Sequence, residues 1–80
     1  MTKEEILKQV ADVFRSVLDD ETLILNMETT ADDVEDWDSL SHIQLVVGLE
    51  KHFHIKFHAR EIMEWENIGG VVNSIVSKLS

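Results

Sequence analysis

The sequence predicts an all-α fold, a small bundle of three main helices plus one short helix, with a long loop between helices one and two. Apolar residues recur at spacings of three and four in three separate segments, which is the helical pattern. One short segment, residues 23–27, alternates as a strand would, but no second strand-like segment exists to pair with it. The length of 80 residues suits one domain, expected to span residues 1–80.

The first helix is expected at about residues 3–17. Thr2 and Glu5 have the spacing of a capping box at its start. Its apolar face consists of Ile6, Val10, Val13, Phe14, Val17 and Leu18. A connection of about twenty residues follows, and loops of that length are uncommon in compact domains unless they are functional. Within it, residues 23–27 are interpreted as a loop segment that tucks apolar side chains over the core.

The second helix begins after Asp38, a good N-cap residue, so Ser39 falls in its first turn. The face expected to be buried contains Leu45, Val46, Leu49 and Phe53. A second apolar stripe, formed by Leu40, Ile43 and Val47, is expected to stay near the surface. Exposed apolar stripes of this kind are typical of partner sites.

Two further helices are expected in the last third of the chain. Residues 60–64 form at most a short helix, with Ile62 and Trp65 turned inward. Asn67 then caps the last helix, whose apolar face is Ile68, Val71, Val72, Ile75, Val76 and Leu79. Gly69 and Gly70 each lower its intrinsic stability by about 1 kcal/mol. They indicate a place where another backbone approaches the helix closely.

Charge narrows the possible partners. The chain has 7 basic and 16 acidic residues, a net charge of −9, and no Lys or Arg from Ser16 to Glu50. Nucleic acid and anionic membranes would be repelled, whereas basic partners would be attracted. The alternative is that these acids only solvate the surface. The N-terminus lacks the pattern of a signal peptide, and no apolar run is long enough to span a bilayer, so we expect a cytoplasmic protein. We also expect a monomer.

The residues around Ser39 carry a family resemblance. The segment reads Asp36-Trp37-Asp38-Ser39-Leu40-Ser41-His42-Ile43. It resembles the phosphopantetheine attachment motif of acyl carrier proteins, in which Asp-Ser-Leu begins the second helix. Further matches to family positions are Thr29-Thr30-Ala31-Asp32, Glu50 with Phe53, Ile55 with Phe57, and the cap Asn67. Together with the length and acidity of the chain, they extend the resemblance over nearly the whole sequence.

The resemblance implies a carrier that serves partner enzymes and is not itself an enzyme. A phosphopantetheinyl transferase would attach 4′-phosphopantetheine from coenzyme A to the hydroxyl of Ser39, and the thiol of this arm would hold acyl groups as thioesters. Asp38 would serve recognition and metal-assisted transfer by that enzyme. We expect the phosphate to lie beside free N–H groups at the positive end of the second helix. The cargo would belong to fatty-acid, polyketide or related specialised biosynthesis.

The resemblance also implies a docking surface for acyl-loading and acyl-processing enzymes with basic grooves. Its expected residues are Asp38, Leu40, Ile43, Val47 and Glu50, with the neighbouring acids Glu35 and Asp36. Three residues depart from the pattern. Gln44 and Lys51 stand where many fatty-acid carriers have acids, and Trp37 stands where many members have a small residue. These departures indicate a specialised carrier that serves its own pathway.

Two alternatives stay open: an aminoacyl or peptidyl carrier, and an unmodified helical module that binds a partner through the exposed stripe. A hydrolase built on Ser39 and His42 is disfavoured, because a nucleophile elbow would need glycine at positions 37 and 41. Trp37 and Trp65 are expected to pack in the core or at its rim.

No metal site is expected. His52, His54 and His58 fit no common ligand motif and are interpreted as solvated histidines. The absence of cysteine excludes disulfides and thiolate ligands.

Overall fold

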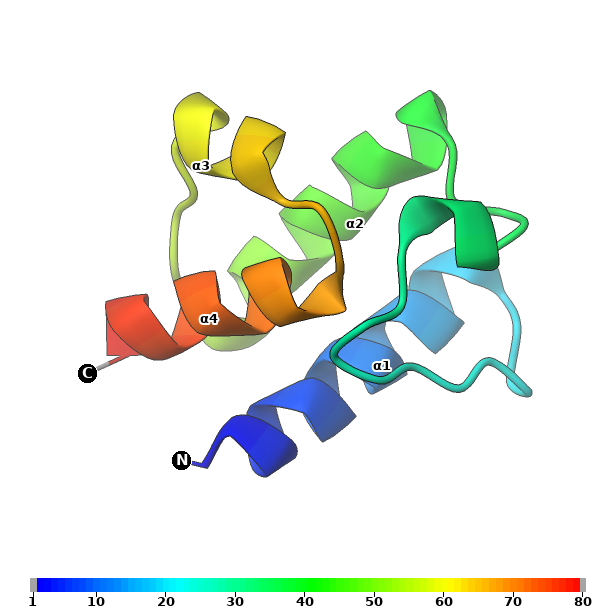
Figure 1. The fold of residues 1–80 in the computed structure, drawn as a ribbon, viewed down its shortest axis with the longest axis horizontal. Coiled ribbons are helices and arrows are strands. Elements are labelled where there is room, and N and C mark those ends of the chain that lie inside the picture. Colours follow the sequence, from blue (N-terminus) through cyan, green and yellow to red (C-terminus); the bar gives the residue numbers. More distant parts are fainter. Residues whose placement is uncertain (1, 80) are drawn as a thin grey trace.

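The computed structural model describes residues 2–79, and in that part the secondary structure is entirely helical. The elements are α1 (Lys3–Leu18), a short 3-10 turn η1 (Ala31–Asp33), α2 (Ser39–Phe53), α3 (Ala59–Glu64) and α4 (Ile68–Leu79). This confirms the predicted bundle of three main helices and one short helix (Figure 1). None of the described helices has the length and apolar character needed to cross a membrane.

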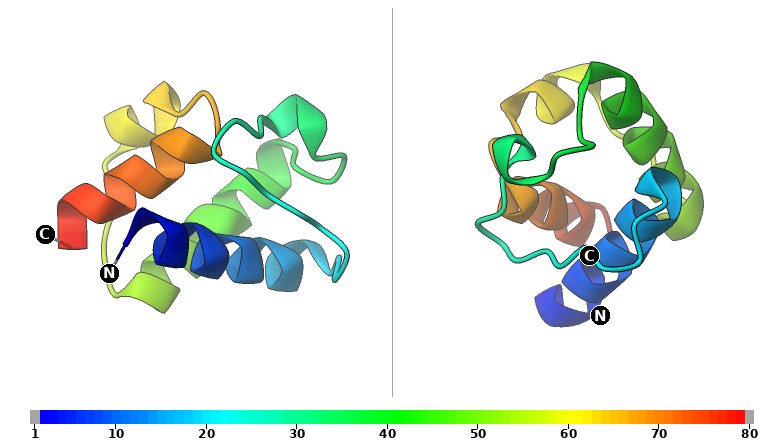
Figure 2. Two further views of the ribbon diagram at one scale, coloured as in Figure 1. Left: turned by 60° about the horizontal axis from the view of Figure 1, so that its bottom comes forward. Right: turned by 90° about the vertical axis from the view of Figure 1, so that its right-hand side faces the viewer.

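Helix α1 packs against both α2 and α4, and α3 packs against α4 (Figures 1 and 2). The predicted apolar faces meet in one core, with two exceptions. Val46 is only half-buried, because it lies on the side of α2 between the buried Leu45 face and solvent. Leu79, the last residue of α4, is 41% exposed and lies beyond the surface that the other helices cover. Ile62 and Trp65, expected inside, are half-buried.

The start of α1 confirms the capping box. The backbone N–H of Glu5 donates to the Thr2 hydroxyl at 3.1 Å, and the N–H of Thr2 donates to the Glu5 carboxylate at 3.5 Å. The helix ends at Leu18, and the backbone of its C-cap residue Asp19 is left-handed with φ 53°. The predicted boundary at residue 17 was therefore short by one residue.

The loop after α1 covers the core as predicted, but only the side chains on one face of the loop are turned inward. Leu25 is buried and Leu23 and Met27 are half-buried, whereas Ile24 is 82% exposed. The turn η1 was not predicted, because three residues are too few to show a helical period. It begins after Thr30, whose backbone N–H and hydroxyl both donate to the Asp33 carboxylate.

The same loop is fixed to the start of α4. The N–H of Gly69 donates to the carbonyl of Met27 at 2.7 Å, and the N–H of Ile68 donates to the carbonyl of Thr29 at 2.8 Å. A Cβ atom on Gly69 would lie 2.9 Å from the Met27 carbonyl oxygen, so glycine allows this contact. The close backbone approach predicted from the two glycines is thus confirmed at Gly69. Asn67 caps α4 as predicted, through Gly70 N–H at 3.1 Å.

Candidate functional site

Ser39 is the first residue of α2 and lies exposed at the surface. Its hydroxyl forms no hydrogen bond with any residue in the described range 2–79. The loop that is held on α4 leads the chain through η1 to this point (Figure 1). The fold therefore exposes the Ser39 hydroxyl and does not depend on it for a hydrogen bond.

Asp38 caps α2 as predicted. Its Oδ1 accepts the N–H groups of Leu40 at 3.0 Å and Ser41 at 2.9 Å, while the Ser41 hydroxyl accepts the N–H of Asp38 at 2.8 Å. The hydrogen bond from the Ser41 backbone is the main reason why the pKa of Asp38 lies below its ordinary value of 3.8. The hydrogen bond from the Leu40 N–H adds to this effect, and the lowering outweighs the opposing desolvation. Asp38 is thus a charged, fixed carboxylate beside Ser39.

The expectation of free N–H groups at this helix end is wrong for most of the first turn. Asp38 occupies the N–H groups of Leu40 and Ser41 through its side chain and that of His42 through its carbonyl, at 2.9 Å. Because a carboxylate already sits at the positive end of the helix, a phosphate on Ser39 gains little from the dipole. The capped helix end therefore offers few free N–H groups to an anion at Ser39.

A tryptophan–histidine pair lies next to Ser39. Trp37 donates its Nε1–H to Nδ1 of His42 at 3.0 Å, and the two rings stack with an interplanar angle of 16°. Trp37 also packs edge-on against Phe14, with ring centroids 5.1 Å apart. The Nδ1 lone pair of His42 is therefore engaged by Trp37, which further disfavours a Ser39–His42 hydrolase. The predicted packing role of Trp37 is confirmed, but its hydrogen bond was not foreseen.

The expected docking stripe is exposed. Leu40 is 70%, Ile43 63% and Val47 42% accessible along α2. A group of large, exposed apolar side chains on one helix is unusual in a small domain and is typical of an interaction site.

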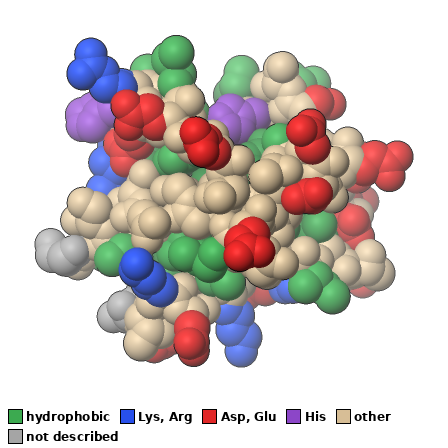
Figure 3. All heavy atoms as spheres, viewed as in Figure 1, with side chains coloured by type: hydrophobic (Ala, Val, Ile, Leu, Met, Phe, Trp, Pro, Cys, Tyr) green, Lys and Arg blue, Asp and Glu red, His purple; other side chains and the backbone are tan. Residues whose placement is uncertain are grey.

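Acidic residues lie beside this stripe. Glu35 and Asp36 are exposed, and Figure 3 shows predominantly acidic side chains on the right-hand side, over η1 and its flanking loops. Glu50 differs from them, because it is half-buried and its Oε2 accepts the N–H of Phe57 at 2.8 Å. Glu50 therefore also holds the α2–α3 connection in place.

The histidines considered above as metal ligands do not converge. His52, His54 and His58 are all exposed, and His52 contacts the amide oxygen of Gln9 at 2.8 Å through Nε2. Across residues 2–79, no three His, Cys, Asp or Glu side chains are grouped so that they could hold a metal ion.

Comparison with known proteins decides the family. Residues 8–75 match the family described as "Phosphopantetheine attachment site". The chain belongs to this family. An acyl carrier protein of Acidothermus cellulolyticus is 30% identical over 77 residues, which cover 96% of this chain and 92% of that protein. The holo acyl carrier protein from Geobacter metallireducens, solved by solution NMR, has a TM-score of 0.87 at 40% identity, covering 92% of this chain and 85% of that one.

The protein thus functions as an acyl carrier protein, and its prosthetic group is 4′-phosphopantetheine. Proteins of this family are carriers and are not themselves catalytic. They are substrates for a phosphopantetheinyl transferase and for biosynthetic enzymes. The thiol of the prosthetic group, when bound, supplies the thioester chemistry of the family.

The residues near Ser39 fit this group. An open hollow of about 430 Å³ adjoins the hydroxyl and is lined by Ala31, Trp37, Asp38, Ser39 and His42. A phosphodiester needs an accessible oxygen, and an unpaired serine hydroxyl at an exposed helix start offers one. The open hollow leaves room for such a group beside this hydroxyl.

Proposed function

We propose that Ser39 is the residue that carries the phosphopantetheine arm. One observation carries the proposal: its hydroxyl is exposed and unpaired, directly after the helix cap, within the sequence matched to the attachment family. Attachment joins the Ser39 oxygen to the phosphorus of the phosphopantetheine group of coenzyme A. The pyrophosphate bond of coenzyme A breaks, adenosine 3′,5′-bisphosphate leaves, and the hydroxyl proton is released. Nothing in the local hydrogen bonding has to break for this.

Asp38 is proposed to help the transferase recognise the site. Its Oδ1 is occupied by two backbone N–H groups, whereas its Oδ2 accepts no hydrogen bond from residues 2–79. Oδ2 is therefore available to a transferase residue or to a metal ion that the transferase holds. The cap fixes the position of this oxygen relative to Ser39.

Partner enzymes are proposed to dock on α2 with basic surfaces. Leu40, Ile43 and Val47 provide apolar contact, and the acids Glu35 and Asp36 attract the partner at long range. Asp38 and Glu50 add to this field while they also hold local structure. The docking surface thus combines a contact stripe with a steering charge.

The cargo is proposed to be an acyl group of a specialised fatty-acid, polyketide or related pathway in the cytoplasm. Support comes from three departures from the usual fatty-acid carriers, namely Trp37, Gln44 and Lys51. Trp37 has a defined place in the structure through its bond to His42. Intact-mass measurement of the protein isolated from its native cells distinguishes an acyl cargo from an aminoacyl or peptidyl one.

The attachment site is tested by incubating the purified protein with a phosphopantetheinyl transferase and coenzyme A, then measuring intact mass. The native chain should gain the mass of the arm, and Ser39→Ala should gain nothing. Ser16→Ala, an exposed serine on α1, is the matched control and should gain the arm fully. A native chain that gains nothing would instead support the unmodified interaction module, and a modified Ser39→Ala chain would place the arm elsewhere.

Steering is tested with Glu35→Lys and Asp36→Lys, because neither side chain has a bonding partner within residues 2–79. The rate of association with the transferase should fall several-fold at low ionic strength and much less at high salt. Glu4→Lys, an exposed acid on α1, provides the same charge change away from α2. Equal effects at both salt concentrations would contradict steering.

A further inference from the structure

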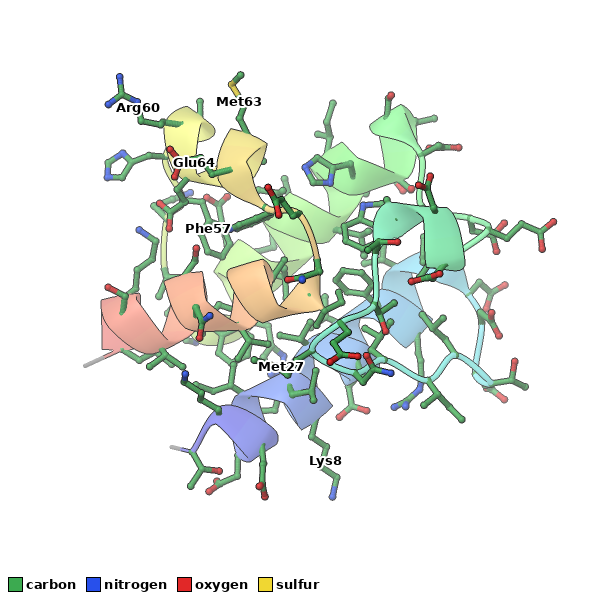
Figure 4. All side chains as sticks on the ribbon, in the orientation of Figure 1. Lys8, Met27, Phe57, Arg60, Met63 and Glu64 are labelled. Atoms are coloured by element: carbon green, nitrogen blue, oxygen red, sulfur yellow. The ribbon has the colours of Figure 1, made fainter. Side chains whose placement is uncertain are left out.

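The two ends of α2 have opposite charge. The segment of residues 51–60 contains no acid, and its charged or titratable residues are Lys51, His52, His54, Lys56, His58 and Arg60. All six are exposed. Arg60 points away from the molecule at the outer edge of α3, near the exposed Met63 (Figure 4).

The cations of this segment form no ion pair with the described residues around them. Within residues 2–79 the ion pairs are Arg15 with Asp12 and Lys78 with Glu61, both at 3.0 Å. Lys51, Lys56 and Arg60 are in neither pair. A basic surface without internal partners, on a protein of net charge −9, is available to an acidic partner.

A groove of about 410 Å³ lies at this end of α2. Its lining is Val47, Glu50, Lys51, His54, Ile55 and Lys56. Val47 and Ile55 offer apolar surface, and Lys51 and Lys56 offer positive charge. Glu50 opposes them, but its Oε2 is bonded to the N–H of Phe57 and so is directed to the protein's own backbone.

The groove is continuous with the docking stripe. Val47 is the last residue of the stripe and also lines the groove. Helix α2 has 15 residues, so its length is about 22 Å. A standard interface buries about 800 Å² on each partner, which corresponds to a patch roughly 30 Å across. A partner that covers the stripe therefore reaches both ends of α2.

We propose that partner enzymes recognise α2 as a bipolar surface, with acidic side chains of the partner placed in the groove at Lys51 and Lys56. This rests on the proposed docking through α2 and adds what the partner must carry: a basic region for the Ser39 end and an acidic region for the groove. A uniformly basic docking face would be repelled at the groove, so the bipolar charge selects among partners and fixes their orientation. An anionic membrane fits less well, because it is flat and is repelled by the net charge of −9.

The test uses two synthetic helical peptides with the same leucine stripe. One has lysines at one end and glutamates at the other, and the second has lysines at both ends. Their Kd values are measured by fluorescence anisotropy for the native chain, for Lys51→Glu/Lys56→Glu and for Lys3→Glu/Lys8→Glu. The last variant makes the same charge change on exposed lysines of α1, where Lys8 points away from the bundle (Figure 4).

The groove variant should shift the ratio of the two Kd values on the order of tenfold in favour of the uniformly basic peptide. The α1 variant should leave the ratio within about twofold of the native value. Lys51→Gln/Lys56→Gln should produce a smaller shift in the same direction. This variant replaces the double charge reversal if circular dichroism shows that the reversal disturbs folding.

Equal shifts in the groove and α1 variants would mean that only net charge matters and would overturn the proposal. A ratio that does not move, while binding to phosphatidylglycerol vesicles depends on Lys51 and Lys56, would overturn it as well. The intact-mass assay is independent of both results. Failure of the native chain to gain the arm would reject the proposed site at Ser39, whereas an unchanged peptide ratio with normal arm attachment would reject only the bipolar surface.

Discussion

The N-terminal ends of α2 and α4 differ in the groups that accept hydrogen bonds from their first backbone N–H groups. Each helix begins with backbone N–H groups that have no partner within the helix. At α4 the N–H groups of Ile68 and Gly69 donate to carbonyls of the long loop, at 2.8 Å and 2.7 Å, and the cap Asn67 accepts the N–H of Gly70 through its side chain. At α2 the capping side chain of Asp38 accepts the N–H groups of the first turn.

The difference separates a helix end that is held by another segment from the helix end that carries the proposed attachment residue. The start of α4 is buried, because another segment must lie against it to supply the carbonyls. The start of α2 needs no other segment, so Ser39 can remain exposed without leaving N–H groups unsatisfied. A local cap is thus what allows the Ser39 hydroxyl, the proposed attachment point, to stand at the surface.

Gly69→Ala should have the largest effect on stability. Its Cβ would lie 2.9 Å from the Met27 carbonyl oxygen, a backbone atom that moves only if the loop moves. We expect a net loss of about 1–2 kcal/mol in the free energy of unfolding, after the gain in helix propensity. Urea denaturation measures it.

Gly70→Ala is the matched control for this prediction. A Cβ there would meet Trp65 at 3.4 Å, an ordinary contact, so the gain in helix propensity of up to about 1 kcal/mol should dominate. If both variants were equally stable, the close contact between the loop and α4 would not constrain the fold.

Asp38→Ala should come next, with a lower unfolding midpoint of roughly a few degrees, because it removes the cap of α2. Asp38→Asn keeps a capping oxygen and should recover most of the loss at neutral pH. Thermal unfolding followed by circular dichroism compares the two. An Asp38→Ala protein as stable as the native chain would show that the helix end is not held by this side chain.

The pH dependence of Asp38 gives a second measure of the cap. Its pKa is below 3.8 in the folded state, chiefly because of the Ser41 backbone hydrogen bond, so the unfolded state binds a proton more readily. The stability contributed by the charge is therefore present above about pH 3.8 and is lost as the pH falls through the folded pKa. The difference in free energy of unfolding between the native chain and Asp38→Asn should shrink as the pH falls through that acidic range. A difference that stayed constant down to about pH 2 would contradict the charged cap.

Features set by local sequence could be predicted. The capping box of Thr2 and Glu5, the cap Asp38 and the exposed stripe from Leu40 to Val47 all follow from spacing within one helix. The contact at Gly69 could also be anticipated, because a glycine in an early helical turn has a strong physical reason to be there. The exposure of Ser39 followed from its place at the helix start.

Features set by the path of the chain could not be predicted. The bond between Trp37 and His42 joins a loop residue to a helix residue, so it depends on how the loop enters α2. The bond of Glu50 to the N–H of Phe57 depends in the same way on the turn after α2. That turn contains His54 in a left-handed conformation, which only a few per cent of non-glycine residues adopt.

His54→Gly should raise the free energy of unfolding, whereas Gly69→Ala and Asp38→Ala should lower it, and the change should be smaller than theirs. His54 has φ 58°, a conformation that glycine adopts without the steric penalty of a Cβ atom. We expect a gain of about 0.5–1 kcal/mol in the free energy of unfolding, measured in urea. His52→Gly, inside α2, should instead lose about 1 kcal/mol. A loss at both positions would mean that the His54 side chain stabilises the end of α2 through its contacts.

Ser39→Ala should have the smallest effect on folding and completes the comparison with Gly69→Ala, since both place alanine in the first turn of a helix. The Ser39 hydroxyl bonds to nothing within residues 2–79, so its removal should change the free energy of unfolding by less than about 0.5 kcal/mol. Urea denaturation of the unmodified proteins measures this change. A loss above about 1 kcal/mol would show that the hydroxyl supports the helix end, as the close contacts of Gly69 support α4. A near-zero change combined with complete loss of arm attachment would show that α2 keeps its fold and its chemistry on different atoms: the carboxylate of Asp38 for one and the hydroxyl of Ser39 for the other.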